Sequence, residues 1–263
     1  VKSSDEVIDI DGYNYDSVDK ETLTIGTGEN VINIYYTKRN DLSYTVNYLE
    51  SVTNKVLHEP KNQTGVTFET KINAEDEVID INGYNYDYPD KYELVVGTGE
   101  NVINIYYSKV TGLTYTVNFL EKGTNKVLFP SNNQGDMTFG DTVKASDEVI
   151  DIDGYNYDSV DKDVLTIGTG ENVINIYYTK RTDLSYKVNY LEKGTNKVLH
   201  DQKVQENMTF KATVKSSDEV IDIDGYNYNS VDKDNLTIGT GENVINIYYT
   251  KRTDLSYKVN YLE

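Results

Sequence analysis

The sequence predicts a β-rich α+β fold made of small tandem modules that form an elongated rod. The order Val-Ile-Asp-Ile begins at Val7, Val78, Val149 and Val220, so the chain repeats every 71 residues without an insertion. Apolar and polar residues alternate over much of each copy, which is typical of strands that bury one face. Turn-forming glycine and asparagine residues separate these alternating runs. A small module has a thin core, and the 25 tyrosines supply large apolar rings whose hydroxyls can stay at the rim.

The repeat period divides the chain into five segments. Residues 1–41 are the C-terminal part of one repeat, residues 42–112, 113–183 and 184–254 are whole repeats, and residues 255–263 are the first strand of a further repeat. This division predicts a segment of a longer array.

The first half of each repeat predicts two strands. In the third whole repeat, Leu184, Tyr186, Val188 and Tyr190 alternate with polar residues and predict a half-buried strand. After a turn at 193–196, the short run 197–200 predicts a second, antiparallel strand.

Many of the differences between copies lie in three segments of 21 residues. They are residues 51–71, 122–142 and 193–213. Variation of this kind is typical of an exposed loop, which is therefore our interpretation of these segments.

The second half of each repeat predicts more short strands. Residues 208–210 predict a short strand or the start of one. Residues 213–221 carry no strong apolar stripe with a period of 3.6 residues, so at most one or two helical turns are expected there. Gly225 suits a turn before the extended Tyr226-Asn227-Tyr228. Residues 236–238 and 244–249, separated by Gly-Thr-Gly-Glu-Asn, predict a hairpin whose second strand presents Ile245, Ile247 and Tyr249 on one side.

Short connections between repeats predict the rod. Only residues 251–254 separate the last strand of the third whole repeat from the next strand. Neighbouring modules would then be nearly coaxial. Alternatively, if the folding unit is a 50-residue block such as 214–263, the two flanking strands would pair as a hairpin.

Composition excludes several classes of function. The chain has no cysteine, and its histidines, His58 and His200, align with Phe129, so a packing role is favoured over a catalytic or metal-binding one. A net charge of −19 argues against nucleic-acid binding, and no apolar run is long enough to insert into a membrane. No secretory signal precedes the first repeat, which indicates a soluble, mature segment. No nucleophile, base and orienting group recur together, so we expect no enzyme activity.

One acidic motif suits a calcium ion. Oxygen ligands alternate along it, at Asp151, Asp153, Asn156 and Asp158. The spacing differs from that of an EF-hand loop, and Asn82 and Asn229 replace acidic residues of the motif in other copies. The alternative is a solvated acidic edge that discourages strand pairing. We expect no other cofactor.

Paired tyrosines suggest a sugar-binding surface. Each pair sends one ring to each face of the sheet, and the candidate glycan-binding rings are Tyr35, Tyr106, Tyr177 and Tyr248. Aromatic rings stack on the C–H faces of sugars, while nearby amides and hydroxyls bond to sugar hydroxyls. The alternative is cross-strand packing that stabilises a thin sheet.

Four segments of each repeat together resemble a known family. In the third whole repeat they are residues 186–192, residues 194–199, Gly225-Tyr226 and residues 243–249. This pattern resembles the MucBP (mucin-binding protein) repeat of Gram-positive surface adhesins, although Asp224-Gly225 stands where that family often has Pro-Gly. The resemblance implies a β-grasp, ubiquitin-like module, an extracellular position on the bacterial surface with wall anchoring outside this segment, and binding to host mucin or other glycans.

Two functions follow from the resemblance and the repeats. The first is a non-catalytic adhesin region that binds mucin or other host glycans weakly at each module and gains avidity by repetition. The second is a stalk that projects another binding domain from the cell wall and has no ligand of its own. Neighbouring copies of the chain are a further candidate partner.

Overall fold

A computed structural model describes all residues, 1–263, and contains strands and short 3-10 turns but no α-helix. The expected β-rich character is confirmed. The expected α component is wrong, because the helical segments are 3-10 turns of three or four residues, such as η4 (Ser216–Glu219). No amphipathic stripe with a period of 3.6 residues is present there to bury a longer helix against the sheet.

The chain divides into two compact units, which are described separately. The first contains residues 1–114, 135–141 and 166–171, and the second contains residues 115–134, 142–165 and 172–263. Residues 113–183 therefore contribute to both units.

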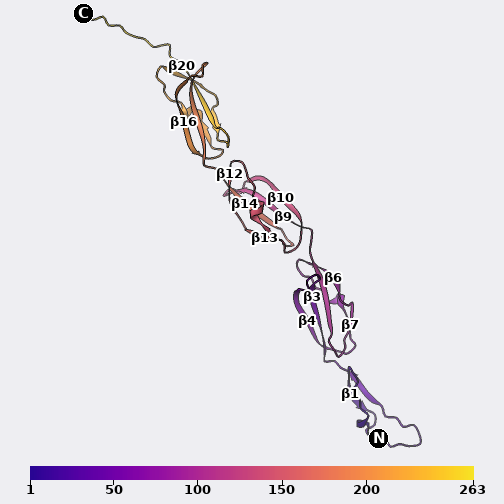
Figure 1. Cartoon of the computed structure of the whole chain (residues 1–263). Helices are drawn as coiled ribbons and strands as arrows, with labels where there is room; N and C mark the ends of the chain where they lie inside the picture. The colour runs from indigo at the N-terminus through magenta and orange to yellow at the C-terminus, as the bar shows by residue number, and fades with distance from the viewer. The chain divides into compact units, whose positions relative to one another are not determined.

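The first unit contains the sheet of the first whole repeat. Its strands are β3 (Leu42–Glu50), β4 (Val56–Val66), β6 (Tyr84–Pro89) and β8 (Val102–Lys109), in the order β4-β3-β8-β6. Figure 1 labels β3, β4 and β6 of this sheet. The central pair β3–β8 is parallel, and the two outer pairs are antiparallel. The strands β5 (Lys71–Asn73) and β7 (Glu93–Val95) form a separate two-stranded sheet. In the sequence, η2 (Ala74–Glu77) and β6 lie between these two strands. The N-terminal residues form the short turn η1 (Ser3–Asp5) and one antiparallel pair, β1 (Tyr13–Val18) with β2 (Ile34–Lys38).

The second unit contains the sheet of the third whole repeat, with the same topology. Its strands are β15 (Leu184–Glu192), β16 (Val198–Met208), β18 (Tyr226–Val231) and β20 (Val244–Lys251), in the order β16-β15-β20-β18. The strands β17 (Thr213–Lys215) and β19 (Asn235–Thr237) form its two-stranded sheet.

The second whole repeat has the strands β9 (Leu113–Glu121), β10 (Val127–Met137), β11 (Thr142–Lys144), β12 (Tyr155–Val160), β13 (Val164–Thr166) and β14 (Val173–Lys180), and the turn η3 (Ala145–Glu148). Its four-stranded sheet has the corresponding order, β10-β9-β14-β12.

The core lies on one face of each central strand pair. Ile245, Ile247 and Tyr249 of β20 are buried together with Val188 and Tyr190 of β15, as the alternation predicts. The intervening positions include Asn189 and Asn246, and Asn189 donates a hydrogen bond of 2.8 Å to Asn246 across the parallel pair. The alternation therefore identifies the buried face correctly.

The predicted hairpin of residues 236–238 and 244–249 is wrong. Both segments are strands, but β19 pairs with β17, and β20 pairs with β15 and β18. The buried Asn243 closes the loop between them: its Oδ1 accepts a bond from the Gly239 N–H at 2.8 Å, and its Nδ2 donates to the Ser185 carbonyl at 3.0 Å. This side chain therefore holds the loop against β15, the strand with which β20 pairs in parallel.

The variable segments are exposed, but they are not loops. Most of residues 193–213 form the edge strand β16, which is eleven residues long and pairs with β15 alone. The short strand predicted at 197–200 is its beginning, and the residues near 208 are its end. An edge strand has one hydrogen-bonded neighbour and mostly exposed side chains, so it tolerates the differences between copies.

The strands on either side of a linker belong to different sheets. β14 lies in the sheet of the second repeat and β15 in that of the third, so the alternative in which flanking strands pair as a hairpin is wrong. Within this linker, Arg181 binds Asp183 through two hydrogen bonds of 3.0 and 2.8 Å. Residues 255–263 form no strand and are exposed.

Candidate functional site

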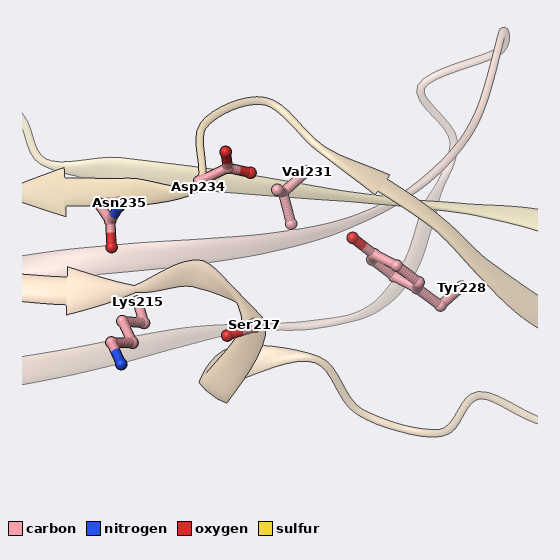
Figure 2. Close-up of a pocket in the computed structure, with 6 residues that line it drawn as sticks. All are labelled: Lys215, Ser217, Tyr228, Val231, Asp234 and Asn235. Atoms are coloured by element: carbon pink, nitrogen blue, oxygen red, sulfur yellow. The ribbon is translucent and has the colours of Figure 1, made fainter.

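A small polar groove lies beside the 3-10 turn of the third repeat. Its volume is about 280 Å³, and its lining residues are Lys215, Ser217, Tyr228, Val231, Asp234 and Asn235. Figure 2 shows Tyr228 and Val231 on one strand, with Ser217 on the turn below them and the hydroxyl of Tyr228 directed toward the middle of the groove. We refer to this feature, and to its counterparts in other repeats, as the Tyr groove.

Backbone pairing holds the walls of the Tyr groove together. Lys215 and Asn235 are paired residues in the small sheet β17–β19. The backbone N–H of Ser216 donates a bond of 2.9 Å to the carbonyl of Asp234, which fixes the turn against the far wall. These bonds connect main-chain atoms, so the groove exists without a ligand to order it.

Tyr228 is the apolar surface of the groove. Its ring meets the buried ring of Tyr249 edge to face, with centroids 6.4 Å apart, and is 50% exposed. The edge contact restrains the ring while a large part of it remains open to solvent.

The chemistry of the groove suits a hydrated, neutral or weakly charged ligand with an apolar face. An aromatic ring, a hydroxyl, a carboxylate and an ammonium group lie around one small volume. This combination is typical of sites that stack on a sugar ring and bond to its hydroxyls. The residues that line the groove include no histidine and no cysteine.

The Tyr groove recurs at the repeat period. In the second repeat it is lined by Lys144, Ser146, Tyr157, Val160, Asp163 and Val164, and has a volume of about 330 Å³. In residues 1–41 it is lined by Lys2, Ser3, Ser4, Tyr15, Val18, Glu21 and Thr22, and has a volume of about 380 Å³. Tyr15 and Tyr157 are 49% and 50% exposed, which matches Tyr228.

The first whole repeat departs from this pattern. Asn73, Glu75, Pro89 and Tyr92 occupy the positions of the groove lysine, serine, valine and acid. These changes remove a positive charge, add a negative one and place a large ring where a carboxylate lies in the other copies. This copy therefore has a different surface at the same place in the fold.

The tyrosines singled out in the sequence lie elsewhere. Tyr35 is exposed, whereas Tyr106, Tyr177 and Tyr248 are half-buried on the sheet face opposite the buried tyrosine of each pair. Tyr106 packs against Tyr88 with ring centroids 5.2 Å apart. None of the four lines the Tyr groove. The groove tyrosine is the second one of each Tyr-Asn-Tyr string, and the sequence signal that marks it is its recurrence just after the turn glycine.

The acidic residues proposed for calcium are not brought together. The structure contains no group of three or more acidic or histidine side chains that could hold a metal ion. Asp158 binds the ammonium of Lys122, and this hydrogen bond lowers the pKa of the Asp158 carboxyl. Asp153 accepts a bond of 3.1 Å from the Thr240 hydroxyl. Calcium binding stays a prediction, and a calcium titration of the full chain is its test.

Both histidines pack against aromatic rings. His58 meets Tyr48, and His200 meets Tyr190, edge to face with centroids 5.5 and 5.4 Å apart. Phe129 makes the corresponding contact with Phe119 at 5.9 Å. The packing role expected for this position agrees with these contacts.

Comparison with known proteins gives two distant structural likenesses. No family model matches the chain, and no curated protein matches it. Streptococcal High Identity Repeats in Tandem (SHIRT) domains 3–4 from a cell surface protein are 15% identical over 53% of this chain and 98% of theirs, with a TM-score of 0.24. The Mub-RV crystal structure is 14% identical over 80% of this chain and 99% of its own, with a TM-score of 0.20. At these TM-scores neither likeness establishes a shared fold. No helix of the chain has the length and apolarity needed to cross a bilayer.

Proposed function

We propose that this chain is a non-catalytic repeat region of a bacterial surface adhesin that binds mucin or other host glycans at several weak sites. The observation that carries the proposal is the recurrence of the Tyr groove, which presents a half-exposed ring among polar groups in three copies. Each site is small, so a single groove would bind weakly. Repetition along one chain converts weak contacts into avidity.

The resemblance to MucBP repeats supplies the wider context of the proposal. It supports an extracellular position on a Gram-positive cell surface, wall anchoring through other segments, and a β-grasp origin of the module. The order of the four-stranded sheet, with a parallel central pair, is compatible with a β-grasp sheet that lacks the helix. The rod remains a prediction from the short linkers, and small-angle scattering of the full chain tests it.

The test compares groove variants of the full chain on immobilised mucin. Tyr157→Ala and Tyr228→Ala remove the exposed rings of the two whole repeats that have the groove, and we expect the double variant to lose at least about tenfold in apparent affinity. Tyr86→Ala is the matched control, because it changes the corresponding ring in the repeat with the altered surface. Equal binding by the wild type and the double variant would reject the groove as the glycan site.

The alternative function is a stalk without a ligand of its own. The altered groove of the first whole repeat favours it, because a spacer places no demand on this surface. The same assay separates the two functions. A stalk shows no mucin binding in the wild type, whereas an adhesin shows binding that is weaker in the double variant.

A further inference from the structure

The turn glycines Gly83 and Gly154 each lie against a phenylalanine ring of the following repeat. Gly154 has φ +79°, and a Cβ built on it would lie 2.3 Å from the ring of Phe210. Gly83 has φ +84°, and a Cβ on it would lie 2.3 Å from the ring of Phe139. Glycine is therefore required twice, once for the left-handed backbone and once for the contact with the ring.

Neighbouring groups enclose the ring from other sides. Tyr155 meets Phe210 edge to face, with centroids 5.6 Å apart and an interplanar angle of 75°. The ammonium of Lys211 lies 5.0 Å from the centroid of Phe210 and 5.8 Å from that of Tyr155. Tyr155, a residue of the second repeat, also packs against the core of the third. Aromatic and cation contacts of this kind add to the area that the rings bury.

Backbone and side-chain hydrogen bonds join the same two repeats. The Phe210 N–H donates to the Arg181 carbonyl of the second repeat at 2.9 Å. Within the second repeat, the Arg181 N–H donates to the Gly154 carbonyl at 3.0 Å. The Thr240 hydroxyl, from the Gly-Thr-Gly loop of the third repeat, donates to Asp153 beside the glycine. In the first unit, Thr169 donates to Asn82 at 2.9 Å, which is the corresponding contact.

We propose that the turn glycine and the tyrosine after it form an interaction surface whose partner is the phenylalanine of the following repeat, and that this contact couples the folding of the two repeats. The acidic motif that precedes the glycine is then part of the junction between two repeats of the chain. The recurrence of the motif at every repeat follows from the need for a neighbour at that position. Linear arrays stabilise themselves by such nearest-neighbour contacts.

The chain contains a matched control for this proposal. Gly225 of the third repeat has the same φ, +79°, but no atom lies within 4 Å of a Cβ built on it. Alanine at Gly225 therefore adds only the cost of the left-handed backbone, whereas alanine at Gly154 adds that cost and a clash with Phe210. The difference between the two variants measures the contact between repeats.

The experiment is amide hydrogen exchange of the full chain carrying Gly154→Ala or Gly225→Ala. We expect Gly154→Ala to accelerate exchange of the Phe210 amide by about tenfold, which corresponds to about 1.4 kcal/mol of lost coupling. We expect Gly225→Ala to leave this amide unchanged. Equal acceleration in both variants, or none in either, would overturn the proposal.

A second variant keeps the test decisive if Gly154→Ala does not fold. Thr240→Val removes only the hydroxyl that bonds to Asp153, and we expect it to accelerate the same amide by about twofold. An unchanged rate in Thr240→Val would then count against coupling at this junction. A calorimetric transition of the third repeat that shifts in the Gly154→Ala protein, although the substitution lies in the second repeat, would support it.

Discussion

The hydroxyl of Tyr186 donates a hydrogen bond of 2.7 Å to the buried carboxylate of Glu219. The other oxygen of Glu219 accepts a bond of 2.5 Å from the ammonium of Lys203. The first whole repeat has the same trio in Tyr44, Glu77 and Lys61. A charged carboxylate in a thin core is tolerated because both of its oxygens are bonded.

Replacing Tyr186 by phenylalanine should destabilise the third repeat. The substitution keeps the ring but leaves one oxygen of the buried Glu219 without its donor, and the expected cost is about 1–3 kcal/mol. Urea unfolding followed through amide signals of the third repeat measures this loss. Tyr228→Phe is the control, because its ring is half exposed in the Tyr groove. Similar losses from the two substitutions would contradict a special role for the bond to Glu219.

Replacing Asn132 by lysine should stabilise the second repeat. Asn132 stands where the other whole repeats have Lys61 and Lys203, so the carboxylate of Glu148 has the Tyr115 hydroxyl, at 2.7 Å, but no lysine at this position. The new ammonium would pair with Glu148 and stabilise the repeat by about 0.5–1 kcal/mol, because the lysine itself remains partly exposed. Unfolding in low and in 1 M salt measures the gain, which should shrink as salt screens the pair. Asn132→Met keeps the length without the charge and should give no such salt-dependent gain.

Raising the pH from about 10 to about 12 should lower the stability of the repeats. Burial, together with the hydrogen bond to Glu148, raises the pKa of Tyr115 to about 12, and burial also raises the pKa of Tyr186. The folded state therefore holds these protons more tightly than the unfolded state, whose tyrosines titrate near pH 10. The stability from this effect is present below about pH 10 and is lost as the pH rises toward 12. Thermal unfolding between these values checks the trend, which should be weaker in Tyr115→Phe; an unchanged slope would argue against this residue as a source.

Replacing Ser216 by alanine should stabilise the third repeat. The side-chain hydroxyl of Ser216 is fully buried and has no hydrogen-bond partner, and the corresponding residues are Ala74 and Ala145. Removing an unbonded buried hydroxyl should raise the free energy of unfolding by about 1 kcal/mol. The reverse change, Ala145→Ser, should lower the stability of the second repeat by a similar amount. Chemical unfolding of both variants should give changes in the free energy of unfolding with opposite signs. A lower free energy of unfolding in Ser216→Ala would show that the hydroxyl has a hydrogen-bond partner.

Several elements of the fold could be predicted from the sequence because they depend on local pattern. Alternation along 244–249 identified the buried face, since successive strand residues point to opposite sides. Gly225 predicted a turn, and its φ of +79° is a conformation that few other residues adopt readily. The length of β16 was not predictable in the same way, because its side chains are mostly exposed and carry no alternating signal.

The candidate site was predictable only in its residue type. Tyrosines among polar residues suggested a sugar surface, but the residues that line the Tyr groove come from a short turn, two small strands and an edge strand. Alternation placed Tyr248 on the outer face of the sheet, whereas the edge position of Tyr228 leaves half of its ring open to solvent. Exposure of that kind depends on which strands lie at the edge.

The sequence by itself determined the 71-residue period, the positions of most strands and the side of each central strand that is buried. The tertiary structure alone decided which strands pair, and hence where the Tyr groove and the contact of Gly154 with Phe210 lie. The physical reason is that alternation with a period of two specifies the sheet face to which a side chain points. Backbone N–H and C=O groups are the same in every strand, so they do not specify which strands pair. Asn243 secures the observed pairing of β20 with β15, because its side chain donates a hydrogen bond to the Ser185 carbonyl of β15.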